Sequence, residues 1–253
     1  MAKRVSLEVE TTKEGSDLPA QVDLVESGAA LDSMRNSDFD VYSAYGEVVD
    51  NSIQANAKNI KILMTYTPKT PGKRNEPVET VAFGDDGDGM TSEILHRCLQ
   101  LGYSSRRNDR TGIGRFGVGA TLAAINQCKR VDIYSKVVGK AWLYTCFDLD
   151  EITARRMTGI PAPIEKQPPH DFAKLVGVES GTLVVWSKYD RQHDDASVIL
   201  AEFMVWAGRT YRKFISAGVT LSLNGEVIHS IDPLYLDLAT TKFEPLPKNW
   251  TGC

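Results

Sequence analysis

Hydrophobic positions recur along the chain with the spacing of helices in some stretches and with the alternation of strands in others. Over 38–57 they fall on one helical stripe, formed by Val41, Ala44, Tyr45, Val48 and Ser52. Further helices are predicted over 92–101, where Thr91 supplies an N-cap, over 115–127 and over 196–215. The first helix is amphipathic, so its polar side is available for solvent or for a site.

Strand-like apolar runs lie between and after these helices, at 59–66, 81–85, 130–136, 141–148, 182–187 and 219–223. Prolines and glycines mark the segments 67–77 and 161–171 as loops. Tight turns are predicted at Gly139 with Lys140 and at Asn224 with Gly225. Because hairpins rather than βαβ repeats join the strands, the chain is predicted to be an α+β fold with a mixed sheet layered with helices.

Composition narrows the class of protein. The chain has 253 residues, of which 42% are hydrophobic and 25% charged, and this excludes a disordered or fibrous chain. A net charge of −4 excludes a global positive field that would attract nucleic acid or membrane, although a local basic patch stays open. The four cysteines are widely spaced and include no CxxC pair, which argues against a zinc site or a disulfide scaffold. The start lacks a signal-peptide core and no apolar run reaches about 18 residues, so we expect a cytoplasmic protein without membrane contact.

The first predicted helix carries a polar stripe. Glu47, Asp50 and Asn51 project from one side, and Ser43 and Gln54 extend the stripe. The stripe is either the solvent face of an amphipathic helix or part of a site. In a site, Glu47 would orient or deprotonate a water molecule. The side-chain oxygen of Asn51 is a hard, neutral ligand that suits Mg²⁺.

A turn rich in Asp and Gly follows the apolar run at 81–85. Asp85 stands at the strand end, and Gly87 and Gly89 permit positive φ or a close approach of the backbone to a ligand. A carboxylate here would accept a hydrogen bond from the exocyclic amine of adenine, and Met90 would offer a polarizable contact to the ring. The alternative is an acidic surface turn. A calcium-binding turn is disfavoured, because the spacing does not fit an EF-hand loop.

Four glycines lie within eight residues at the start of the helix predicted over 115–127, at positions 112, 114, 117 and 119. Free N–H groups at a helix N-terminus bind anions. Hydroxyls and positive charges stand nearby, on Ser104, Ser105, Arg106, Arg107, Arg110 and Arg115. The segment either binds phosphate or is a basic solvent loop. Its GxGxxG spacing is not a dinucleotide-binding fingerprint, because 104–111 cannot form the buried strand that must precede one, and the GxxxxGK[ST] phosphate loop is absent.

In chain order, E-x-x-x-N at 47–51, D-x-G-x-G-M at 85–90, G-x-G-x-F-G-x-G at 112–119 and G-T at 181–182 resemble the motifs of the GHKL ATPases. These proteins share the Bergerat nucleotide-binding fold. The resemblance covers about 31–230 and is nearest to MORC-like and heat-shock-chaperone-like bacterial ATPases. It implies a two-layer sandwich, in which helices cover a mixed, mainly antiparallel sheet and a glycine-rich segment forms a lid over ATP.

The resemblance also implies roles for single residues. Glu47 would be the general base that activates the attacking water, and Asn51 would be the ligand of Mg²⁺. Asp85 would accept from the adenine amino group, with Thr182 acting through ordered water. The remaining nucleotide-binding residues would be Ala55, Gly87, Gly89, Met90, Ser104, Ser105, Gly112, Gly114, Arg115, Phe116, Gly117, Val118 and Gly119. Of these, Ala55 and Met90 would lie near the adenine, and 112–119 would cradle the phosphates.

Three positions depart from the family pattern. Gln54 stands where many members have Asp, Asp86 where many have Asn, and Arg115 where several have Gln. The first two are compatible with the resemblance, because neither supplies the charge on the water or the metal. Arg115 either adds a phosphate contact or is a surface charge.

We expect three parts along the chain: a segment 1–30, a nucleotide-binding domain 31–230, and the start of a linker or following domain at 231–253. The first segment is either a strap exchanged within a nucleotide-dependent homodimer or a frayed end. Relatives commonly take a phosphate-sensing Lys or Arg from a following domain. The chain stops at 253, and if that residue is missing, the resemblance implies slow hydrolysis with binding retained.

Two classes of function that involve ATP remain open from the sequence. One is an ATPase whose hydrolysis resets a clamp acting on DNA or on a client protein. The other is a regulatory module that binds ATP or ADP without splitting it, and an NAD-binding protein is a third alternative. The sequence shows no nucleic-acid site, and Arg209, Arg212 and Lys213 are interpreted as a solvated helix face.

Overall fold

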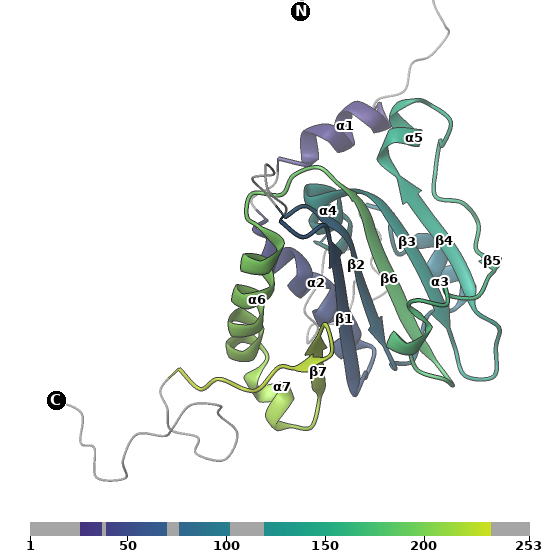
Figure 1. Ribbon diagram of the computed structural model, residues 1–253. Helices are drawn as coiled ribbons and strands as arrows, with labels where there is room; N and C mark the ends of the chain where they lie inside the picture. The colour runs from purple at the N-terminus through teal and green to yellow at the C-terminus, as the bar shows by residue number, and fades with distance from the viewer. Residues whose placement is uncertain (1–25, 37–38, 70–75, 102–118, 234–253) are drawn as a thin grey trace, which may run out of the picture.

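The fold is an eight-stranded sheet with helices packed on one face, as seen in the computed structural model (Figure 1). The structure describes residues 26–36, 39–69, 76–101 and 119–233. The helices are α1 (Ser27–Met34), α2 (Val41–Gln54), α3 (Ser92–Arg97), α4 (Gly119–Gln127), α5 (Leu149–Thr153), α6 (Ala196–Thr210) and α7 (Arg212–Ser216), with a 3₁₀ turn η1 (Ala173–Leu175). The strands are β1 (Asn59–Tyr66), β2 (Val78–Asp85), β3 (Cys128–Lys136), β4 (Leu143–Asp148), β5 (Ile164–Glu165), β6 (Gly181–Tyr189), β7 (Thr220–Leu223) and β8 (Glu226–Val227).

The strands follow the order β5-β4-β3-β6-β2-β1-β7-β8 across the sheet. Every neighbouring pair is antiparallel except β1 and β7, which run parallel. A mixed, mainly antiparallel sheet covered by helices is the predicted α+β architecture, which is thereby confirmed. The topology brings β2 and β6 side by side at the middle of the sheet, although about a hundred residues separate them in the chain.

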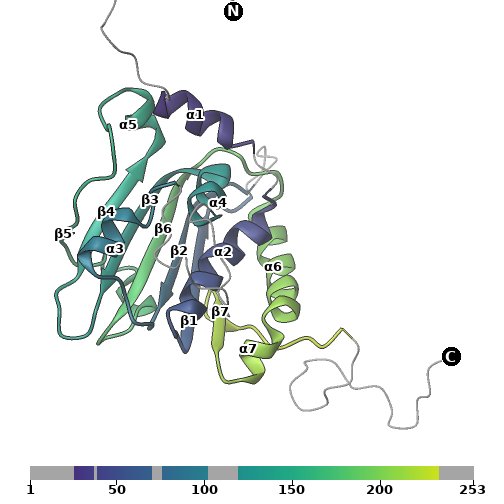
Figure 2. The same cartoon turned by 180° about the vertical axis from the view of Figure 1, so that it is seen from behind.

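Alternate residues of the central strands feed two hydrophobic clusters, one on each face of the sheet. The helix-side cluster contains four aromatic rings, Tyr45, Phe83, Trp186 and Phe203, whose neighbouring centroids lie 5.2–5.7 Å apart. Figure 2 shows α2 and α4 lying over this face. The smaller cluster on the opposite face is closed by η1 and its neighbours, with Leu175 packed over Leu183. Since both faces are covered, the middle of the sheet is rigidly held.

The local pattern predicted most elements, with errors at their ends. β1 has the predicted bounds, and the turns at Gly139 and at Asn224 with Gly225 are confirmed by positive φ angles and hairpin pairing. α2 begins at Val41, because the Asp40 side chain caps it by accepting from the Ser43 amide. The predicted start of the helix at 115 lies outside the described residues, which enter it at Gly119.

Other expectations about elements were wrong. The helix predicted over 92–101 ends at Arg97, and the one predicted over 196–215 is divided at Tyr211 into α6 and α7. α1, α5 and the two-residue strands β5 and β8 were not predicted. Each of these short elements packs against or pairs with another element, whether that element is near or distant in the chain. β8, for example, is a strand only through its pairing with β7.

No helix among the described residues is long and apolar enough to cross a membrane.

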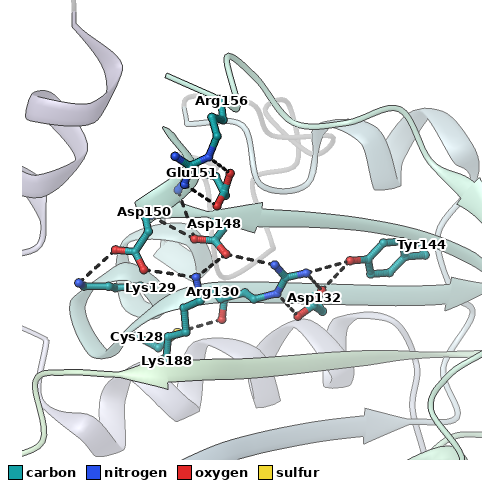
Figure 3. A network of polar contacts seen from close by, with 10 residues as sticks. All are labelled: Cys128, Lys129, Arg130, Asp132, Tyr144, Asp148, Asp150, Glu151, Arg156 and Lys188. Carbon is teal, nitrogen blue, oxygen red and sulfur yellow. Dashed lines mark hydrogen bonds and ion pairs between the residues drawn. The ribbon is translucent and has the colours of Figure 1, made fainter. Parts of the chain in front are cut away.

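A charged network joins β3, β4 and β6 near their junction with α5 (Figure 3). Asp148 is its buried centre, with Oδ2 accepting from Lys188 Nζ at 2.8 Å and from Arg130 Nη1 at 3.1 Å. Its Oδ1 accepts from the amides of Asp150 and Glu151 and so caps α5. Burial opposes ionisation of this carboxyl, but the bonds to Lys188 and Arg130 hold its pKa below the usual range.

Replacing Asp148 by Asn is expected to lower the free energy of unfolding at neutral pH by about 1–3 kcal/mol, because two charged donors lose their acceptor. The folded state lowers the pKa of Asp148, so this stabilisation is present above the unfolded pKa of about 4 and is lost as the pH falls below it. Urea unfolding at pH 7 and at about pH 3 should therefore show the difference between wild type and variant shrinking at the lower pH. Asp171→Asn, at an exposed position, is the control. An equal loss at both pH values would contradict the expectation.

Candidate functional site

Three segments converge at one end of the central strands: α2, the turn after β2, and the start of α4. The bond that joins the first two runs from Ser52 Oγ on α2 to Asp85 Oδ2 at the end of β2, over 2.8 Å and within the core. The start of α4 meets α2 at Gly119 and Glu47. The structure therefore brings together residues from the first, second and third sequence motifs.

Asp85 is a buried carboxylate, 4% exposed, that is held by three donors. Besides Ser52, the amides of Gly87 and Thr182 donate to its Oδ1, at 2.9 and 3.1 Å. Burial raises the pKa of Asp85, while these hydrogen bonds act in the opposite direction. A carboxylate fixed in this way has lone pairs left on Oδ2, so it is suited to accept from one further donor such as an amine.

A pair of hydroxyls lies next to Asp85. Ser135 Oγ on β3 and Thr182 Oγ1 on β6 are 2.9 Å apart and both residues are buried. Ser135 Oγ also accepts from the amide of Met90, at 2.8 Å, and thereby fixes the turn that follows Asp85. The predicted residues Asp85, Met90 and Thr182 thus belong to one hydrogen-bonded unit.

Sequence reasoning missed Ser52 and Ser135. Ser52 was assigned to the apolar stripe, and Ser135 was counted as an ordinary strand residue. A signal for Ser135 exists in the sequence, since it is a small polar residue that directly follows the apolar Ile133 and Tyr134. Nothing local identifies its partners, because they lie 45 and 47 residues away along the chain.

The glycines of the second motif are needed for contacts within the chain. A Cβ on Gly87 would lie 2.6 Å from the carbonyl oxygen of Ala55, which also accepts from the Asp88 amide. Gly89 has φ +71°, and a Cβ there would overlap the carbonyl of Lys136. The expected positive φ is therefore present at Gly89. The close backbone approach at Gly87 is to Ala55, at the end of α2.

The departure at Asp86 has a structural reason. Asp86 Oδ1 accepts from the amides of Lys58 and Asn59, both at 2.8 Å, and Oδ2 accepts from Asn59 Nδ2 at 2.6 Å. Partial burial acts against ionisation, yet these donors lower the pKa of Asp86 overall. A carboxylate can satisfy all three donors at the start of β1, which an amide cannot do equally well.

Glu47 is half-buried on α2, beside the first residue of α4. A Cβ on Gly119 would overlap the Glu47 carboxylate, so the two residues are in close contact. Burial, and secondarily the negative charge of Asp50, raise the pKa of Glu47. A raised pKa brings a carboxyl nearer to the range in which a general base is effective at neutral pH.

Asn51 is exposed on α2, between Glu47 and Ser52 in the chain. Among the described residues, no group of three or more His, Cys, Asp or Glu side chains could hold a metal ion. A divalent cation at this place would therefore depend on the Asn51 amide oxygen together with oxygens of a bound ligand and water. That donor set suits Mg²⁺, which keeps several waters and phosphate oxygens in its shell.

Part of the predicted phosphate-binding segment is outside the described residues. It comprises Ser104, Ser105, Gly112, Gly114, Arg115, Phe116, Gly117 and Val118. Gly119, the last residue of this segment, is described and is the first residue of α4. The part of the predicted helix that lies next to the site is therefore described from Gly119 onward.

A separate cavity of about 700 Å³ lies between α1, α3 and α5. Its described lining includes Leu31, Met34, His96, Leu101, Ile152 and Ile160, and none of the predicted site residues. The hydrogen-bonded convergence on Asp85 and the contact between Gly119 and Glu47 carry more chemical information, so we place the candidate site there.

Comparisons with known proteins identify the family of the chain. The family model described as histidine kinase-, DNA gyrase B-, and HSP90-like ATPase matches residues 39–182. The chain is 38% identical over 79 residues to Protein MICRORCHIDIA 3 of Arabidopsis thaliana, which covers 30% of this chain and 12% of that protein. It is 26% identical over 172 residues to Protein MICRORCHIDIA 2 of the same organism, covering 60% of this chain and 26% of that protein.

The fold is also similar to that of a solved structure. The ATPase and transducer domains of DNA topoisomerase II from Balamuthia mandrillaris match with a TM-score of 0.51 and 18% identity, over 75% of this chain and 48% of that chain. At this identity the likeness concerns the fold alone. In both plant relatives the matched part is about a quarter of the whole protein or less.

Proposed function

Because the chain belongs to the family of histidine kinase-, DNA gyrase B- and HSP90-like ATPases, we propose that it binds ATP with Mg²⁺ between α2, the end of β2 and the start of α4, and hydrolyses it slowly. Membership of this family supports ATP binding and hydrolysis in general terms. Beyond this, we propose the role of each residue, the binding of a metal and the consequences of hydrolysis.

The observation that carries the proposal is the fixed, buried carboxylate of Asp85. Its donors hold it in one orientation, and the Ser135 and Thr182 hydroxyls lie beside it. An adenine amino group is a donor that such a carboxylate would accept, while the hydroxyls would bind the ring through water. Recognition by fixed polar groups rejects a ligand that lacks the matching donor.

At the other end of the site, Glu47 would take a proton from the attacking water. Its half-buried position and its raised pKa favour the role of a base over that of an ordinary surface carboxylate. When bound through Asn51, Mg²⁺ would neutralise charge on the phosphates. Backbone amides at the start of α4, near Gly119, would favour a negatively charged phosphate in the same place.

The nucleotide would act as a conformational switch. Closure of a glycine-rich lid over ATP would need γ-phosphate contacts that ADP cannot make, so a closed and dimerised state would be populated before hydrolysis. In a longer protein, such a clamp would act on DNA or on a client protein. The relationship to a DNA topoisomerase II fold and to MICRORCHIDIA proteins makes a clamp of this type our proposal.

Calorimetric titration with ATP, ADP and a non-hydrolysable ATP analogue, each with and without Mg²⁺, tests the proposal. We expect binding of all three, tighter with Mg²⁺ for the triphosphates, and a doubled mass in solution with the analogue only. NADH serves as the competing ligand and should give no heat. A folded sample that gives no heat with any adenine nucleotide would overturn the proposal.

Substituting Gly119 by alanine is expected to lower turnover roughly tenfold, because the added methyl group displaces the Glu47 carboxylate while the flexible side chain partly readjusts. The Kd for ATP and the unfolding midpoint should change little. Gly159→Ala is the matched control, since a Cβ there meets nothing within 4 Å. Wild-type turnover in the Gly119 variant would show that Glu47 need not occupy its present position.

A further inference from the structure

Tyr211 lies at the point where α6 ends and α7 begins. It is 3% exposed, and its backbone has φ −95° and ψ +9°, outside the range of a continuing α-helix. The sequence predicted one unbroken helix here. The break is accompanied by a specific contact, because the Tyr211 side chain extends from the junction to α2 instead of to solvent.

The Tyr211 hydroxyl donates to the carbonyl oxygen of Gly46 at 3.0 Å, in the core and across 165 residues of sequence. Gly46 directly precedes Glu47. The same hydroxyl lies near Asp50, whose negative charge, after burial, contributes to raising the pKa of Tyr211. One side chain from the α6–α7 junction thus contacts the helical turn that carries Glu47.

Packing makes this contact close and directional. A Cβ on Gly46 would lie 2.7 Å from the Trp206 ring and 3.2 Å from the Tyr211 hydroxyl. Trp206 packs edge-on against Tyr211, with ring centroids 5.9 Å apart, and stacks on Phe203. Figure 2 shows α6, which carries Trp206 and Phe203, lying beside α2. The absence of a side chain at Gly46 lets the two aromatic residues reach the α2 backbone.

We propose that Tyr211 is a positioning residue for Glu47: its hydroxyl fixes the rotation of α2 so that the Glu47 carboxylate stays beside Gly119. The inference rests on the proposed function of Glu47 as the base. A side chain on a helix lies about 5–6 Å from the helix axis, so a rotation of ~10° moves its end by ~1 Å. A displacement of that size in a catalytic group costs up to about 10²-fold in rate.

The test compares Tyr211→Phe with a matched control, Tyr45→Phe. Tyr45 lies on α2 in the same aromatic cluster, and its buried hydroxyl interacts with that of Tyr189 on β6, with no hydrogen bond to the backbone of α2 among the described residues. Each variant is assayed for steady-state turnover, for ATP affinity by calorimetry and for thermal unfolding. We expect Tyr211→Phe to lower kcat about tenfold with the Kd for ATP within about twofold, and Tyr45→Phe to change neither by more than about twofold.

Four outcomes would overturn the inference. Tyr211→Phe could match Tyr45→Phe in kcat, which would show that the bond to Gly46 does not matter for turnover. It could lose affinity or unfolding temperature in proportion to kcat, which would make the role structural only. An inactive wild type would overturn the proposed function, and this inference with it. Loss of turnover in a Glu47 variant without loss in Tyr211→Phe overturns the inference alone.

Discussion

Replacing Glu47 by alanine is expected to lower ATP turnover by about 10²- to 10⁴-fold while the Kd for ATP stays within about twofold. The carboxylate lies on α2 against the start of α4, and burial raises its pKa toward the working range of a base. Removing it takes away the group that would accept the water proton, without removing the contacts to adenine at Asp85. Turnover is measured by phosphate release and affinity by calorimetry.

Glu226→Ala is the matched control, because Glu226 is an exposed residue of β8 at the far edge of the sheet. The result also separates the two classes of function left open by the sequence. A wild type that binds ATP but releases no phosphate above background would favour the non-hydrolysing regulatory module. Turnover that survives unchanged in Glu47→Ala would assign the base to another residue.

Replacing Asp85 by asparagine is expected to weaken ATP binding by about 10²- to 10³-fold, because an amide NH₂ would face the adenine amine where an acceptor is required. Asn can still accept from the amides of Gly87 and Thr182 through its oxygen, and Ser52 can rotate to accept. The fold should therefore survive, and the loss should appear in Kd for ATP and for ADP alike.

Asp88→Asn provides the control for Asp85→Asn, since Asp88 is exposed in the same turn and its side chain accepts a hydrogen bond from Asn56. Its Kd for ATP should equal that of wild type. Circular dichroism and thermal unfolding of both variants check that the turn is retained. An unchanged affinity in a folded Asp85→Asn variant would remove adenine recognition from this end of the site.

Local sequence determined the elements whose stability comes from their own residues. The stripe on α2 and the alternation of β1 set their type, and Asp40 and Thr91 cap helices through neighbouring amides. Each of these features spans two to four residues, which is the range that a periodic pattern reports. The residues of the D-x-G-x-G-M motif are also close together in the chain, which is why the motif predicted the turn after β2.

The division at Tyr211 could not be seen in the pattern, because apolar positions continue through it with helical spacing. A bond to Gly46 across 165 residues accompanies the break. Ser52 likewise has the spacing of the apolar stripe, and only the position of Asp85 beneath α2 turns it into a hydrogen-bond donor of the site. The role of a polar residue on a buried face thus depends on partners that are distant in the chain and adjacent in the fold.

The sequence by itself determined the α+β class and the family resemblance, and it predicts Glu47, Asn51 and Asp85 as site residues, since these depend on residue type at short spacing. Only the tertiary structure decided which groups surround them. Ser135 reaches Met90 and Thr182, Gly119 meets Glu47, and Tyr211 meets Gly46. The physical reason is that hydrogen bonding and close packing act over a few ångströms in space, whatever the separation along the chain.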